Sequence, residues 1–89
     1  MIKSVRIKVV GKVQHVGFRY YTTLEARKLR IKGFVKNEYD GSVYIEAEGI
    51  LKDLNEFISW CESCPDLAII DKVIFKDSEL KNFKSFDVR

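Results

Sequence analysis

The sequence contains very little proline, cysteine and histidine, and no long hydrophobic run. Its 89 residues include one Pro, two Cys and one His. Two cysteines are too few for a disulfide scaffold, and one histidine excludes a His-rich metal site. The longest aliphatic run, Leu67 to Ile70, is far shorter than a membrane span. The first ten residues interleave charged and apolar side chains, which is not typical of a secretion signal, so a cytoplasmic location is predicted.

Charge is distributed unevenly along the chain. The formal net charge is +3, from 16 Lys and Arg against 13 Asp and Glu. Residues 1–45 carry ten basic and three acidic side chains, whereas residues 46–89 carry six and ten. If the basic half folds into one face, that face attracts anions, although composition does not identify which anion. A chain of this length is expected to form a single domain over residues 1–89 with one modest core.

Stretches in which apolar and polar residues alternate predict the strands. Val5, Ile7 and Val9 indicate a first strand that ends at Gly11. The other strands are expected over residues 33–37, 42–48 and 68–76, with a short fifth strand at Phe86 and Val88. A tight turn at Tyr39-Asp40-Gly41 joins the second and third strands, because Gly tolerates a positive φ there.

Two segments repeat apolar residues at helical spacing and predict helices, one from Phe18 to Leu29 and one from about Leu51 to Cys61. Pro65 prevents the second helix from continuing. Its predicted inward face consists of Leu51, Leu54, Phe57, Ile58 and Cys61. The order β-α-β-β-α-β predicts an α+β fold of the ferredoxin-like, split βαβ type, in which an antiparallel sheet carries two helices on one face.

The pair Cys61-Glu-Ser-Cys64 invites a test for redox or zinc chemistry. The pair falls at a predicted helix C-terminus, where the helix dipole opposes a thiolate. A zinc site needs two further ligands that the chain does not obviously supply. The favoured interpretation is a packed Cys61 and an incidental Cys64, with no metal.

The connection from the first strand to the first helix, Gly11-Lys-Val-Gln-His-Val-Gly-Phe-Arg19, is the best candidate for a functional site. A loop with two glycines can turn backbone N–H groups inward, and the helix N-terminus adds unpaired donors of its own. The planar fork of Arg19 matches two oxygens of a phosphate or carboxylate. The alternative is a simple connection whose arginine is only solvated.

The same residues resemble the acylphosphatase family. Gly11 to Arg19 matches the first motif of that family at every fixed position except one. Gly33-Phe-Val-Lys-Asn37 matches the second motif and is followed by Gly41, Val43 and Gly49 at the family's spacing. The match is to small, free-standing acylphosphatases. It implies hydrolysis of the carboxyl-phosphate bond of acyl phosphates to a carboxylate and inorganic phosphate, without metal or cofactor.

The resemblance also implies residue roles. Arg19 is expected to hold the phosphoryl group, and Asn37 is expected to orient the attacking water. The residues expected to surround the phosphoryl group with backbone N–H groups are Gln14, His15, Val16, Gly17 and Phe18. Considered alone, Asn37 is better interpreted as a turn-capping asparagine before the hairpin, and it is the combination with Arg19 and the two motifs that favours the functional role.

Two positions depart from the family pattern. His15 stands where the family has glycine, at a position that suggests a positive φ, which His tolerates better than most residues. Three interpretations are open: a tolerated, solvent-facing side chain; a loop of altered shape or flexibility with weaker catalysis; or a contact to substrate that adds pH dependence near neutrality. Arg30 stands where the family often has a glycine that caps the helix C-terminus.

Two other functions remain in competition. The same fold binds RNA in the RRM family, and Lys32 to Tyr39 partly resembles its longer motif, but Lys36 replaces the central stacking aromatic. The other alternative is a degenerate acylphosphatase-like domain that binds phosphate or a partner without turnover. The expected partner is a small acyl phosphate, with no specific nucleic acid and no membrane, and the expected state is a monomer.

Overall fold

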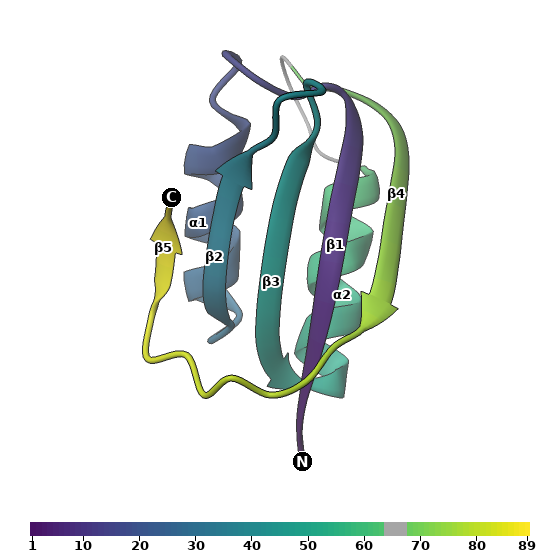
Figure 1. Ribbon diagram of the computed structural model, residues 1–89. Helices are drawn as coiled ribbons and strands as arrows, with labels where there is room; N and C mark the ends of the chain where they lie inside the picture. Colours follow the sequence, from purple (N-terminus) through teal and green to yellow (C-terminus); the bar gives the residue numbers. More distant parts are fainter. Residues whose placement is uncertain (64–67) are drawn as a thin grey trace.

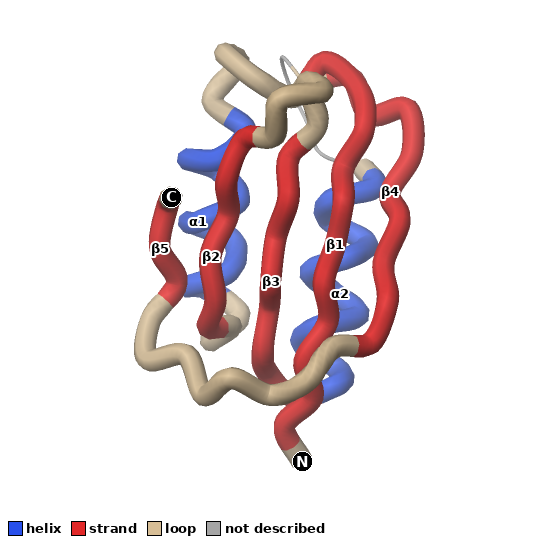
Figure 2. The backbone as a smooth tube through the Cα atoms, in the orientation of Figure 1, coloured by secondary structure: helices blue, strands red, loops and turns tan. Residues whose placement is uncertain are grey.

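The computed structural model describes residues 1–63 and 68–89 (Figure 1). The elements are β1 (Ile2–Lys12), α1 (Phe18–Lys28), β2 (Lys32–Asn37), β3 (Val43–Ile50), α2 (Leu51–Glu62), β4 (Ile69–Asp77) and β5 (Phe86–Val88). Their order confirms the predicted ferredoxin-like fold, with both helices on one face of the sheet (Figures 1 and 2). Cys64 and Pro65, for which predictions were made, lie outside the described residues.

The five strands form one sheet in the order β4-β1-β3-β2-β5. The four long strands pair antiparallel, as predicted, and β5 adds a parallel pair along β2. The prediction that β1 ends at Gly11 is wrong, because the strand continues to Lys12 through a register shift against β4 between Val10 and Gly11. Gly11 has φ 146°, and a Cβ there would lie 2.0 Å from the Ile69 carbonyl oxygen. Glycine therefore permits the close bulge through which β1 leads into the loop that follows.

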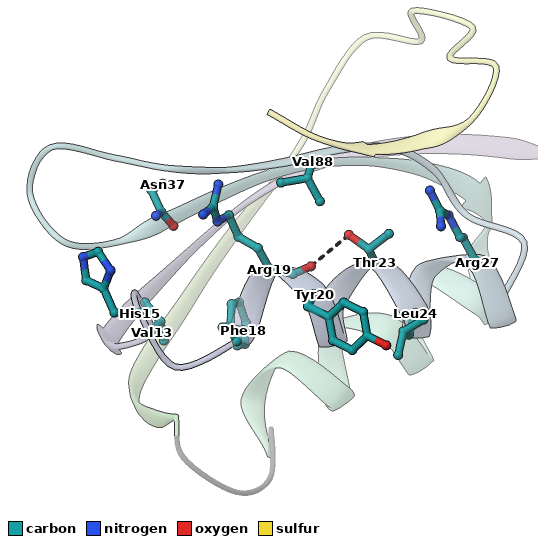
Figure 3. Close-up of a pocket in the computed structure, with 11 residues that line it drawn as sticks. Val13, His15, Phe18, Arg19, Tyr20, Thr23, Leu24, Arg27, Asn37 and Val88 are labelled. Carbon is teal, nitrogen blue, oxygen red and sulfur yellow. Dashed lines mark hydrogen bonds between the residues drawn. The ribbon is translucent and has the colours of Figure 1, made fainter.

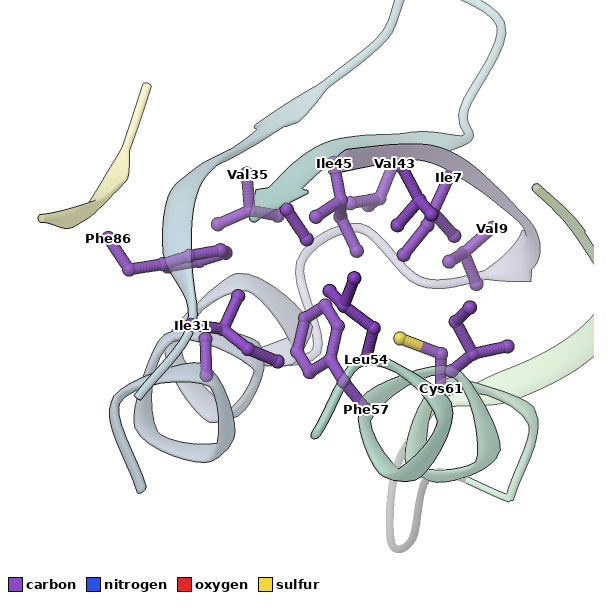
Figure 4. Packing of buried hydrophobic residues seen from close by; sticks show 14 of the residues in the cluster. Ile7, Val9, Ile31, Val35, Val43, Ile45, Leu54, Phe57, Cys61 and Phe86 are labelled. Atoms are coloured by element: carbon purple, nitrogen blue, oxygen red, sulfur yellow. The ribbon is translucent and has the colours of Figure 1, made fainter. Parts of the chain in front are cut away.

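The core lies between the sheet and the two helices (Figure 4). Alternate residues of the central strands point into it, among them Ile7, Val9, Val35, Val43 and Ile45. Most of the predicted inward face of α2 is buried, but Leu51 is 56% exposed and that part of the prediction is wrong. Helix α2 starts at Leu51 directly after β3, so this residue lies in the first turn, where the helix is only beginning to cross the sheet.

The connection between β4 and β5, residues 78–85, crosses the open face of the sheet opposite the helices (Figures 1 and 2). Glu48 accepts hydrogen bonds from the main-chain N–H groups of Lys81 and Phe83. Glu46 pairs with Lys81 Nζ and accepts a bond from the Tyr44 hydroxyl. Both glutamates are buried, and their hydrogen bonds offset the cost of removing charge from water. These contacts hold the segment that carries the chain to β5, beside β2.

Helix α1 ends in a left-handed turn at Arg30, which has φ 61°. The Ile31 N–H bonds to the Ala26 carbonyl at 2.8 Å, and the Arg30 N–H bonds to the Arg27 carbonyl at 3.1 Å. This pair of bonds is the Schellman motif, whose left-handed position is usually glycine. The structure thus confirms that Arg30 occupies a helix-capping position that suits glycine.

We expect Arg30→Gly to raise the free energy of unfolding by about 1 kcal/mol, because a side chain at positive φ is strained and glycine is not. Urea denaturation measures the change. Arg30→Ala is the matched control, since it removes the same charge while keeping the strain. Equal stability of the Gly and Ala variants would contradict this account.

Candidate active site

The loop between β1 and α1, residues 13–17, leads directly into the N-terminus of α1. Gly17 precedes the helix with φ 80°, and His15 has φ 63°. No side chain among the described residues caps this helix end. The first N–H groups of a helix have no partner within it, and the helix dipole favours an anion beside them. An uncapped helix start of this kind is suited to a phosphate or carboxylate, and the loop that the sequence predicts to bind one lies directly before it.

The hairpin between β2 and β3 places Asn37 beside this loop. The predicted turn is present, and Asp40 makes its capping bonds: its carboxylate accepts from the Ser42 N–H at 3.0 Å and from Lys8 Nζ at 2.8 Å. Hydrogen bonds from Lys8 and Ser42 hold the pKa of Asp40 well below its usual range. The turn therefore keeps its charged acceptor at neutral and mildly acidic pH.

Asn37, the last residue of β2, is not the capping residue of this turn. Its Oδ1 atom is buried and has no hydrogen-bond partner among the described residues. A buried acceptor without a partner is unfavourable by about 1–3 kcal/mol, so its presence needs an explanation. A bound donor, such as a water molecule held in the site, would provide one.

A cavity of about 410 Å³ joins these elements (Figure 3). From the predicted site it includes Arg19, Asn37 and the loop residues His15, Gly17 and Phe18. Val13, from the predicted connection, also lines the cavity. The other lining residues were not predicted from the sequence, and they are Tyr20, Thr23, Leu24, Arg27 and Val88. The helical spacing of residues 19, 20, 23, 24 and 27 could have indicated a shared face. Val88 could not be found in this way, because it reaches the cavity through the pairing of β5 with β2.

The cavity is electropositive. Two arginines and no acidic residue are among the residues that line it. Arg19 is half-buried, and its Nη1 makes one long hydrogen bond of 3.4 Å to the main-chain oxygen of Arg89. A guanidinium has five donors, so most of this fork can bind a ligand. Figure 3 shows it on the side of the cavity that carries Asn37.

Comparison with known proteins identifies the family. An acylphosphatase family model matches residues 5–88. The acylphosphatase of Archaeoglobus fulgidus is 48% identical over 85 residues, which cover 96% of each chain. The chain belongs to the acylphosphatase family. An acylphosphatase crystal structure from Bacillus subtilis superposes with a TM-score of 0.94 at 34% identity, covering 100% of this chain and 99% of that one. An acylphosphatase from Coxiella burnetii superposes with a TM-score of 0.95 at 28% identity, covering 99% and 93%.

Membership of the acylphosphatase family makes this protein an enzyme that hydrolyses acyl phosphates. The structure divides its predicted loop residues into two groups. His15, Gly17 and Phe18 line the cavity. Val16 packs against the core, and the side chain of Gln14 reaches the hairpin instead.

Gln14 connects the two motifs of the acylphosphatase site. Its Nε2 donates to the carbonyl oxygens of Glu38 at 2.7 Å and Ser42 at 2.9 Å, one on each side of the β2–β3 turn. These two bonds connect the loop that follows β1 to the β2–β3 turn, which begins directly after Asn37. The sequence motif predicted only a backbone role for this residue.

We expect Gln14→Met, which removes both donors at similar length, to lower kcat by about tenfold or more, since small displacements of positioning groups have effects of this size. Steady-state hydrolysis of benzoyl phosphate measures it. Gln14→Glu is the matched variant: its carboxyl can donate one bond only when protonated, so its rate relative to the parent enzyme should rise as pH falls. An unchanged kcat for Gln14→Met would contradict the positioning role.

His15 has the positive φ that the family glycine predicted, and its exposed side chain lies at the cavity wall (Figure 3). We expect His15→Gly to have a kcat/KM equal to or above that of the parent enzyme, because glycine adopts this conformation without steric cost. His15→Ala serves as the control that removes the imidazole but keeps the strain. A large loss of activity in His15→Gly would instead show that the imidazole contacts the substrate.

Proposed function

We propose that the enzyme hydrolyses acyl phosphates in this cavity without a metal ion. Arg19 and the N–H groups at the start of α1 hold the phosphoryl group, and Asn37 orients the attacking water. The supporting observation is the unpartnered, buried Oδ1 of Asn37 in the same cavity as Arg19. An amide offers both a donor and an acceptor, which suits the holding of a water molecule in line with the phosphorus.

The chemistry proposed requires positioning and charge stabilisation more than proton transfer. The water oxygen bonds to phosphorus, and the bond between phosphorus and the acyl oxygen breaks. The carboxylate leaves with the electron pair, and the water proton passes to the phosphate product or to solvent. Because a carboxylate is a good leaving group, no general base is needed. Arg19 and the backbone N–H groups stabilise the charge on the phosphoryl oxygens.

The test is hydrolysis of benzoyl phosphate in ¹⁸O-labelled water with excess chelator. We expect full turnover with the label in inorganic phosphate, because water attacks phosphorus. Activity that disappears with the chelator would contradict the metal-free mechanism. Label in benzoate would show attack at the carbonyl carbon and contradict the role of the phosphate site. Phosphate binding without hydrolysis would favour a domain that only binds.

The remaining assignments rest on the sequence. We propose a single domain over residues 1–89 that acts as a monomer in the cytoplasm and has no specific nucleic-acid partner. The described residues include no helix long and apolar enough to span a membrane. Tight binding of RNA without hydrolysis would contradict this proposal.

A further inference from the structure

The cavity is longer than a phosphoryl group requires. Arg19 lies toward the end beside Asn37, and Arg27 lies at the other end, two turns further along α1 (Figure 3). Eight residues on a helix span about 12 Å along its axis. Thr23, Leu24 and Val88 line the stretch between the two arginines. An acyl group attached to a phosphate at Arg19 would therefore extend along a largely apolar wall toward a second cation.

Arg27 is held in place but not neutralised. Its Nη2 donates to the main-chain carbonyl oxygen of Phe86 in β5 at 3.1 Å. Among the described residues, Arg27 takes part in no ion pair, and no acidic side chain lines the cavity. One bond uses one of its five donors, so the guanidinium can still bind a carboxylate with two of the others. A fixed, unneutralised arginine in a cavity is suited to bind an anion.

We propose that Arg27 is a specificity-determining residue that binds a carboxylate at the far end of the acyl group. The preferred substrates are then acyl phosphates of long dicarboxylic acids, rather than those of short or uncharged acids. The inference rests on the proposed position of the phosphoryl group at Arg19. Binding at Arg27 would use a remote part of the substrate to hold the reacting group in line with the water.

A matched pair of substrates tests the proposal: the monoacyl phosphate of octanedioic acid and octanoyl phosphate, which differ only in a terminal carboxylate or methyl group. The quantity measured is the ratio of their kcat/KM values, which does not depend on the folded fraction of a variant. We expect this ratio to favour the dicarboxylic substrate by about tenfold, the scale of a charge-assisted hydrogen bond at a partly exposed site. Arg27→Gln should reduce the ratio about tenfold, and Arg27→Lys should reduce it less.

Lys28→Gln is the matched control, because it removes the same charge from the next helix position, which is outside the cavity lining. The ratio should remain that of the parent enzyme. The monoacyl phosphate of butanedioic acid is the length control: its carboxylate is too close to the phosphate to reach Arg27, so its kcat/KM should not gain from this residue. Equal ratios in the parent and Arg27→Gln enzymes, or equal losses in Lys28→Gln, would overturn the proposal. Failure of the parent enzyme to hydrolyse any of these compounds would instead overturn the proposed function beneath it.

Discussion

We expect replacement of Arg19 by alanine to lower kcat/KM for benzoyl phosphate by roughly 10²-fold or more, the scale for loss of one preorganised electrostatic group. The guanidinium extends from the first turn of α1 into an electropositive cavity, beside the N–H groups of the helix start. Without it, two phosphoryl oxygens lose their charge-assisted donors as negative charge develops on them. Affinity for inorganic phosphate as a competitive inhibitor should fall with the rate, because the proposed role of Arg19 is to bind the phosphate group of the substrate and the product alike.

Two further variants distinguish a direct contact between Arg19 and the substrate from a general attraction of anions by positive charge. Arg6→Ala removes the same charge from an exposed position on β1 outside this cavity, and its kcat/KM should stay within about twofold of the parent enzyme, since exposed charges are screened by salt. Arg19→Lys keeps the charge but loses the planar fork, so it should restore only part of the rate. An Arg19→Ala enzyme as active as Arg6→Ala would show that Arg19 only attracts the substrate.

We expect replacement of Asn37 by alanine to lower kcat by roughly 10²-fold while KM stays near that of the parent enzyme, because the proposed role of the residue is to position the water and not the phosphate. The loss should therefore differ in kind from that of Arg19→Ala, in which phosphate affinity also falls. Hydrolysis of benzoyl phosphate measures kcat and KM, and its inhibition by inorganic phosphate measures the phosphate affinity. A rise in KM of the same size with an unchanged kcat would show that Asn37 binds the substrate instead.

Although Asn37→Ala should lower the activity, it should not lower the stability of the fold. Because Asn37 Oδ1 is buried without a partner, its removal should leave the free energy of unfolding unchanged or raise it by up to about 1 kcal/mol. Asn55→Ala, at an exposed position on α2, is the control for loss of an asparagine side chain and should not alter kcat. A marked loss of stability in Asn37→Ala would show that the side chain supports the hairpin rather than the chemistry.

Local patterns were sufficient for most of the architecture. Alternation and helical spacing predicted every strand and helix, and the bounds agree to within about two residues except at the start of β1, which lies three residues before Val5. These periodicities succeed because they record which face of each element is buried. The positive φ values of His15 and Arg30 agree with the resemblance to the acylphosphatase family, which has glycine where His15 stands and often has it where Arg30 stands. The errors, at Gly11 and Leu51, occur at element ends, where a bulge or the edge of the sheet determines the outcome and periodicity is weakest.

Some features of the candidate site could likewise be predicted from the sequence, and others could not. The resemblance to the two acylphosphatase motifs predicted Arg19 and Asn37, and the structure places both in one cavity. The sequence did not indicate that Gln14 would bridge to carbonyls 24 and 28 residues away. Nor did it indicate that Arg27 would share a cavity with Arg19 and Val88. Such contacts depend on which strands become neighbours, and no local pattern carries that information.

By itself, the sequence determined the element order, most of the residues that face the core, the glycine-containing loop before α1 and the two residues expected to carry the chemistry. The tertiary structure alone decided that Glu46 and Glu48, outward residues of an alternating strand, are buried beneath residues 78–85. It also decided that β5, reached through that segment, completes the wall of the cavity with Val88. The physical reason is that periodicity records burial within an element, whereas the distant segment that covers a face is set by the path of the whole chain.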